Sequence, residues 1–139
     1  MDLLAGKKEL EGYYFGRPVD TVGFPLGMTT DPSGFPIFRQ GIIASPSMSP
    51  KSVFHISFQV LPGDSGSPVF VVETIEDNGR IVGFRVVILG IIASAHFGKS
   101  GNTGTNAGLA TIILTAVADV VPSTEILEAV DLLPKKFLE

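Results

Sequence analysis

The residues whose types and spacing suit chemistry lie in the segment PGDSGSP, residues 62–68. Nucleophilic acyl transfer requires a serine hydroxyl that projects from a tight turn, with backbone N–H groups aimed at the carbonyl oxygen that gains charge. Glycines on both sides of Ser65 allow the unusual backbone angles of such a turn. We expect the N–H groups of Gly63 and Ser65 to form an oxyanion hole. The alternative is a glycine-rich surface turn without chemistry.

A base for Ser65 is harder to identify. A serine hydroxyl is a weak nucleophile near neutral pH and needs a base within hydrogen-bond distance. The only histidines are His55 and His96. We predict a structural or surface role for His55, and a contact at the rim of a cleft or a plain surface role for His96. Turn and solvent roles account for four acidic residues, and no spacing of His, Asp and Glu suggests a metal site. These four are Asp20, Asp31, Asp77 and Asp119.

Short runs of β-branched and aromatic residues alternate with Gly- and Pro-containing turns, which indicates an all-β domain. The expected strands are Val19–Pro25, Ile37–Ser45, Ser52–Gln59, Val69–Thr74, Ile81–Ala95 and Gly108–Leu114. Asn78-Gly79 predicts a hairpin turn, and the length of the 81–95 run predicts a bulge or bend at Gly83 or Gly90. The prediction is a lead-in or linker over 1–11, a single antiparallel six-stranded barrel over 12–121, and an α-helix and tail over 122–139, with Ser123 as N-cap.

Composition excludes several classes of function. The chain has 139 residues, a net charge of −4 and no basic stripe, so nucleic acid is not an expected partner. The absence of cysteine excludes disulfides and thiolate metal sites. The N-terminus lacks the apolar stretch of a signal peptide, and the apolar runs 81–95 and 107–121 are too short to span a bilayer. A mean hydropathy of +0.39 indicates a well-filled core or an apolar face that packs against something else.

Several segments together resemble a known family. GDSGSPV resembles the active-site serine motif of the trypsin-like (chymotrypsin-fold) serine peptidases. VDTVGFPLG and FRQGIIAS resemble the first strands of the second barrel in bacterial, Deg-like members, in the right order. GRIVGF and LGIIASA resemble the strand pair after the serine, and NAGLATI resembles the strand that closes the specificity pocket. The resemblance covers roughly residues 12–133 and is limited to the second, C-terminal barrel.

The resemblance implies roles for particular residues. Ser65 is the nucleophile of an oxyanion-hole loop made of Gly63, Asp64 and Ser65, in which Asp64 orients the loop. A polypeptide substrate pairs with one strand edge. That edge consists of Ile92, Ala93, Ser94 and Ala95. Gln59 lies near the base of the specificity pocket, with Ala95 and Gly108 on its walls, which implies an uncharged, small or aliphatic side chain before the cut. No cofactor is implied.

The same resemblance leaves the function open between classes. In this family the catalytic His and Asp come from the first barrel, and only about a dozen residues precede the second-barrel pattern here, so we expect this chain alone to be inert. It is then one half of a serine endopeptidase, or a non-catalytic barrel that binds peptides or proteins. A third reading is a small β-barrel binding module unrelated to peptidases. Because two-barrel peptidases bury a shared apolar interface, a partner barrel, a second copy of the chain or a longer parent protein is expected.

Overall fold

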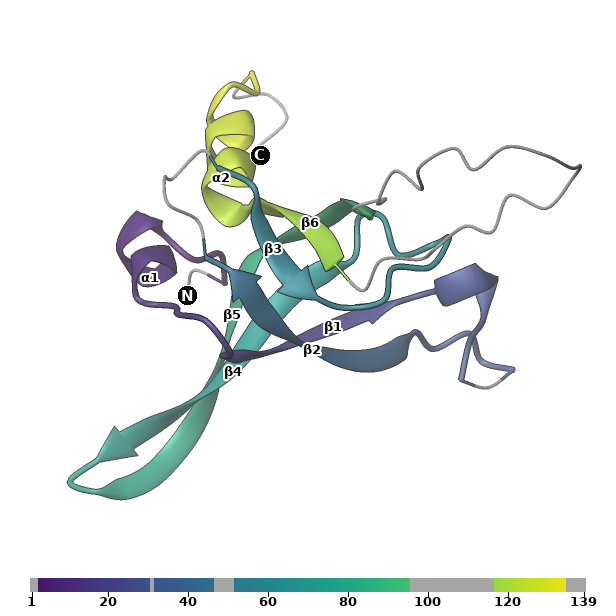
Figure 1. Cartoon of the computed structure of the whole chain (residues 1–139). Helices are drawn as coiled ribbons and strands as arrows, with labels where there is room; N and C mark the ends of the chain where they lie inside the picture. The colour runs from purple at the N-terminus through teal and green to yellow at the C-terminus, as the bar shows by residue number, and fades with distance from the viewer. Residues whose placement is uncertain (1–2, 31, 47–51, 96–116, 135–139) are drawn as a thin grey trace, which may run out of the picture.

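The computed structural model describes residues 3–30, 32–46, 52–95 and 117–134 (Figure 1). The described elements are two helices, one 3-10 turn and six strands, and every strand pairing is antiparallel, which confirms a mostly β chain with a C-terminal helix. In chain order they are α1 (Lys7–Glu11), β1 (Pro18–Gly23), η1 (Pro25–Gly27), β2 (Ile37–Ser45), β3 (Phe54–Ser57), β4 (Pro68–Asp77), β5 (Arg80–Ala95), β6 (Val117–Pro122) and α2 (Ser123–Asp131).

The six strands close into a ring in the order β1-β2-β3-β6-β5-β4. Alternate residues of each strand point into the ring, since side chains on a strand alternate between its two faces. In β6, for example, Ala118 and Val120 are buried while Asp119 between them is only partly so. The buried apolar residues form one cluster inside the ring. Its largest members are Ile56, Leu89, Ile92, Val19, Val69, Val71, Val87 and Val120.

The strand β6 differs from the last strand expected from the sequence. The predicted strand Gly108–Leu114 lies outside the described residues. The strand that closes the ring is Val117–Pro122, which pairs with β3 on one side and with β5 on the other. It follows the predicted strand within one apolar run, and no Gly or Pro separates the two, so composition does not mark where a strand begins there.

The turn and the bulges predicted for β4 and β5 are confirmed. Asn78 and Gly79 both have positive φ (49° and 76°), as a two-residue hairpin turn of the primed type requires. The pairing register of β4 and β5 shifts directly beside the Val69–Gly90 pair and again directly beside the Ile75–Gly83 pair. A Cβ at Gly90 would overlap the carbonyl oxygen of Val121, so the bulge at this position also lets β6 approach closely.

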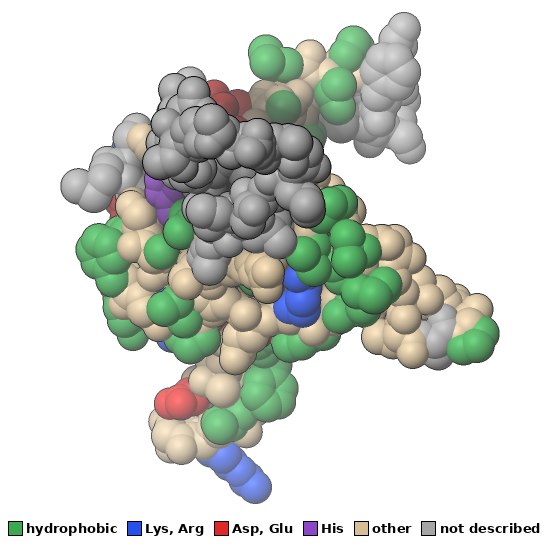
Figure 2. All heavy atoms as spheres, turned by 45° about the vertical axis from the view of Figure 1, so that its right-hand side comes forward, with side chains coloured by type: hydrophobic (Ala, Val, Ile, Leu, Met, Phe, Trp, Pro, Cys, Tyr) green, Lys and Arg blue, Asp and Glu red, His purple; other side chains and the backbone are tan. Residues whose placement is uncertain are grey.

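Beyond the ring, the outer halves of β4 and β5 continue as a two-stranded ribbon that projects from the body of the molecule (Figure 1). One face carries Val72, Phe84 and Val86, which are between 40 and 70% exposed. Figure 2 shows hydrophobic side chains along this ribbon above its charged tip. The opposite face carries Glu73 and Arg85, which lie directly across from each other and form an ion pair at 2.7 Å.

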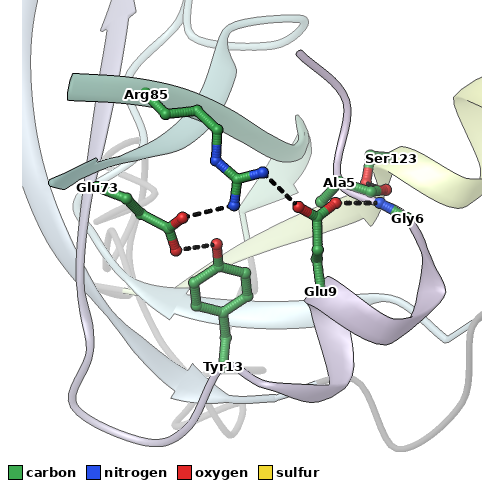
Figure 3. A network of polar contacts seen from close by, with 7 residues as sticks. All are labelled: Ala5, Gly6, Glu9, Tyr13, Glu73, Arg85 and Ser123. Carbon is green, nitrogen blue, oxygen red and sulfur yellow. Dashed lines mark hydrogen bonds and ion pairs between the residues drawn. The ribbon is translucent and has the colours of Figure 1, made fainter. Parts of the chain in front are cut away.

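The first residues of the chain pack against the ring, although the sequence predicted only a lead-in or linker there. Leu4 forms a parallel bridge with Ile88 of β5, and the N–H of Ala5 donates to the Ile88 carbonyl at 2.9 Å. Ala5 is fully buried, and its carbonyl accepts from the Ser123 hydroxyl at 2.7 Å (Figure 3). Ser123 therefore does not cap α2. It is the first helical residue, and Pro122 stands at the N-cap position.

A polar network joins α1 and the segment after it to the ribbon (Figure 3). The Tyr13 hydroxyl donates to Glu73 at 2.9 Å, and Arg85 donates to Glu73 at 2.7 Å and to Glu9 at 3.0 Å. The hydrogen bond from Arg85 is the main reason that the pKa of Glu73 lies below its ordinary value. Burial, with the bond to the Glu73 carboxylate, raises the pKa of Tyr13. The network secures residues 3–13 on the face of the ribbon opposite Phe84.

Among the helices that the structure describes, none combines the length and the apolar character needed to cross a membrane.

Candidate functional site

Ser65 lies on an exposed turn between β3 and β4. The turn is possible because Gly63 and Gly66 adopt φ of +97° and +87°, a region that side chains with a Cβ rarely enter. Ser65 itself is exposed, and its Oγ lies 3.5 Å from the carbonyl oxygen of Ala93. That distance is long for a hydroxyl hydrogen bond, so the hydroxyl is only weakly held and remains accessible.

Asp64 holds the turn in place through its buried side chain. Its side chain is fully buried, and its Oδ2 accepts from the Leu61 N–H at 2.6 Å. Its Oδ1 pairs with the Arg39 guanidinium, which extends from β2. Arg39 is held in turn by the Gln59 carbonyl at 3.2 Å and by the face of the Phe58 ring, 4.4 Å from its centroid. This ion pair is fully buried on the Asp64 side and 22% exposed on the Arg39 side, and with the additional bonds it holds the residue next to Ser65 in position.

The two ends of the turn are attached to different elements. At one end, the Gly66 N–H donates to the Ile92 carbonyl at 2.7 Å, and the Ile92 N–H donates to the Ser67 carbonyl at 2.9 Å. At the other end, the Pro62 carbonyl accepts from the Leu26 N–H of η1 at 2.5 Å. The turn is therefore held between the edge of β5 and η1.

The backbone N–H groups of the turn divide into two sets. Those of Asp64, Gly66 and Ser67 donate to carbonyls at 2.7–3.0 Å. Those of Gly63 and Ser65 donate to no other residue in the part of the chain that the structure describes. These are the two groups predicted to form an oxyanion hole, and both remain available to an external acceptor.

The residues expected to contact substrate are only partly brought together. Ile92, Ala93, Ser94 and Ala95 form the end of β5, directly beside the Ser65 turn. Ile92 is hydrogen-bonded to Gly66 and Ser67 on the edge away from β6. Beyond Ile92, the described residues pair this segment with β6 only, because the pairing of β4 with β5 stops at Pro68 and Ile91. No strand among the described residues covers the edge of residues 93–95 that faces away from β6, and an added strand could pair there.

The expected specificity pocket is not assembled from the residues described. Gln59 lies on an open cavity of about 450 Å³ whose other lining residues are Arg39, Gln40, Ser57 and Phe58. Ala95 is not among them, and Gly108 and His96 lie outside the described residues. Arg39 places a cation in this lining, whereas the resemblance implied an uncharged pocket. The charge is balanced by Asp64.

His55 and Asp119 contact each other at a distance from the turn. They lie opposite each other on β3 and β6, with His55 Nε2 3.2 Å from Asp119 Oδ1. The other carboxylate oxygen of Asp119 accepts from the Ser94 hydroxyl at 2.6 Å. A structural or surface position for His55 agrees with the prediction. Asp119 was expected in a turn or in solvent, and instead it bridges three strands. No contact between this group and Ser65 is recorded among the described residues.

Two parts of the site were missed from the sequence. Arg39 and the η1 residues contact the turn through the fold alone, and nothing in the spacing of FRQG or FPLG signals these partners. Comparison of the chain with protein-family models, with curated proteins and with solved structures gives no match. The functional conclusion therefore rests on the geometry around Ser65.

Proposed function

We propose that this chain is the nucleophile-bearing barrel of a trypsin-like serine endopeptidase, and that it is inert until a base is supplied from another domain or chain. The observation that carries this proposal is the turn itself. An exposed serine lies between two glycines of positive φ, beside two N–H groups without an acceptor in the described residues. A simple surface turn does not require a fully buried aspartate paired with arginine beneath it.

The proposed reaction follows from these groups. Ser65 Oγ attacks the carbonyl carbon of a peptide bond, the new O–C bond forms, and the π-electron pair moves onto the carbonyl oxygen. The N–H groups of Gly63 and Ser65 donate to that oxygen as it gains charge. The serine proton passes to the base and then to the leaving amine as the C–N bond breaks. Water hydrolyses the resulting ester through the same steps.

Among the described residues, no base lies beside Ser65. In the described part of the chain, the recorded contact of Ser65 Oγ is the Ala93 carbonyl, and no titratable side chain touches it. His55 is turned to Asp119 on the outside of the ring. The resemblance implies that a histidine and an aspartate reach Ser65 from a first barrel. The open edge of residues 93–95 supports strand addition as the way in which a peptide is held.

A peptidyl boronic acid tests the proposal without requiring a base. Boron accepts the Ser65 oxygen and becomes a tetrahedral anion, and the hydroxyl proton goes to solvent. We expect the backbone amide resonances of Gly63 and Ser65 to move downfield in ¹H–¹⁵N spectra as they donate to the boronate oxygen. Ser65→Ala should abolish the adduct, and Ser33→Ala, at an exposed serine of the 28–36 loop, should leave it unchanged. Equal reaction of wild type and Ser65→Ala would refute the proposal.

The second candidate is a non-catalytic barrel that binds a peptide at the same edge. The absence of a base beside Ser65 in the described residues favours it. A fluorophosphonate probe separates the two functions when a domain that supplies a histidine and an aspartate is added: Ser65-dependent labelling that accelerates with that domain identifies the enzyme. Peptide binding without any acceleration of labelling identifies the binding domain.

A further inference from the structure

Leu26 occupies a backbone position that does not suit leucine. Its φ and ψ are 56° and 23°, in the left-handed region, where a side chain with a Cβ costs free energy and where Gly or Asn is usual. Core packing does not explain the choice, because Leu26 is 60% exposed. The next residue, Gly27, has φ of 71° and needs no such explanation. An exposed, strained leucine points to a role outside the fold.

Leu26 lies directly beside the nucleophile turn. Its N–H donates to the Pro62 carbonyl at 2.5 Å, and a Cβ built on Gly63 would lie 3.5 Å from the Leu26 nitrogen. That Cβ would also overlap the carbonyl oxygen of Phe24, whose side chain is 45% exposed. Two exposed apolar residues of η1 and its N-cap therefore flank the end of the turn that carries the proposed oxyanion donor.

We propose that Leu26 and Phe24 form an apolar subsite for the leaving-group side of the substrate, and that the chain prefers an apolar side chain one or two residues after the cut. This inference rests on the proposed function of Ser65. The direction follows from the two attachments of the turn. The acyl part of a peptide lies along residues 93–95 of β5, which follow Ile92, the residue bonded to Gly66, so the leaving part points toward η1, to which Pro62 is bonded.

The separation of Gly63 and Leu26 suits a subsite one or two residues from the cut, because a Cβ built on Gly63 would lie 3.5 Å from the Leu26 nitrogen. An extended peptide advances about 3.3–3.6 Å per residue, so the first or second residue after the cut reaches the neighbourhood of Leu26 from Gly63. An apolar side chain there gains by covering exposed carbon surface on Leu26 and Phe24. Partial burial of one apolar side chain in a half-open site corresponds to a preference of about tenfold over a substrate with a small group at the same position.

Peptidyl α-ketoamides test the inference, because they keep residues on the leaving side. The Ser65 oxygen bonds to the ketone carbon, and the π-electron pair of the ketone moves onto the ketone oxygen. The serine hydroxyl proton reaches the ketone oxygen through water, so no group leaves. Two probes share one acyl part and differ in the amide substituent, isobutyl against methyl. We expect the isobutyl probe to bind wild-type chain about tenfold more tightly, measured by amide shifts of Gly63 and Ser65.

Leu26→Asn is the decisive variant, because we expect it to keep or raise stability while it removes the preference for the isobutyl probe. Asparagine tolerates the left-handed region, so the urea midpoint of unfolding should stay the same or rise. The preference for the isobutyl probe should disappear. Leu132→Asn, at an 85% exposed leucine just after α2, should leave the preference intact. A purely structural leucine would instead show a lower midpoint and an unchanged preference, which would overturn the inference.

The peptidyl boronic acid has no leaving-side residue. It therefore distinguishes a failure of the proposed subsite from a failure of the proposed function. If the boronate binds Ser65 but the two ketoamides bind equally, the subsite is wrong and the proposed nucleophile stands. If neither class of probe forms a Ser65-dependent adduct, the proposed function itself is wrong and the subsite falls with it.

Discussion

Replacing Arg39 with methionine tests whether the ion pair under the turn holds the Ser65 loop in place. Methionine keeps much of the apolar stem over Phe58 but removes the guanidinium. The Asp64 carboxylate then remains fully buried with the Leu61 N–H as its recorded hydrogen-bond donor in the described chain. Removing one partner of a buried charge pair costs about 3–5 kcal/mol, because the other charge is left uncompensated. Since the Arg39 side chain is 22% exposed, we expect the lower end, about 3 kcal/mol.

Urea unfolding measures this loss. With a slope of about 1–3 kcal/mol per molar for a small domain, the midpoint should fall by roughly 1–3 M. Arg80→Met, at the exposed ribbon tip, serves as the matched control and should change stability by less than about 0.5 kcal/mol. The double variant Arg39→Met with Asp64→Leu should recover part of the loss, because an apolar pair can replace a buried ion pair at little cost while the Leu61 N–H loses its acceptor.

The same variant connects the ion pair to the site. If the pair positions the turn, Arg39→Met should also weaken the boronate adduct under conditions in which the chain is still folded. A loss below about 1 kcal/mol, or a double variant whose loss is the sum of the two single losses, would refute the reasoning, since either result would mean that the two charges do not depend on each other.

Two further predictions concern the turn and the ribbon. In urea unfolding, Gly63→Ala should cost about 1–3 kcal/mol of stability because of its φ of +97°, and more because the new Cβ overlaps the Phe24 carbonyl. Gly34→Ala is the control: its φ is +82° but its Cβ would meet open space, so only the first cost should appear. The Arg85 hydrogen bond lowers the pKa of Glu73 below its ordinary 4.5, so its contribution to stability is present above that pH and is lost as the pH falls through the lower folded value. Glu73→Gln should lose less stability than the wild type as the pH is lowered, which circular dichroism can follow. An identical loss in the variant would contradict this.

Local signals in the sequence predicted local structure well. Ile37–Ser45 was predicted with the bounds that β2 has, because Pro residues and turns delimit a β-branched run. Asn78-Gly79 marked the hairpin, since a primed turn needs positive φ at both positions. The same reasoning failed at β6 and at Ser123, where no Gly or Pro divides the apolar run and where the serine hydroxyl bonds to Ala5 instead of capping its helix.

From its amino acids alone, this chain shows a mostly β domain and an exposed serine turn, because turn residues and strand periodicity act over a few neighbouring positions. Only the closed ring decided what surrounds that serine. It brings Arg39 to Asp64 across 25 positions, places η1 against Pro62, and leaves the end of β5 with one edge that no described strand covers. These contacts depend on which strands become neighbours, and strand order is a property of the packed core that no local pattern of residues encodes.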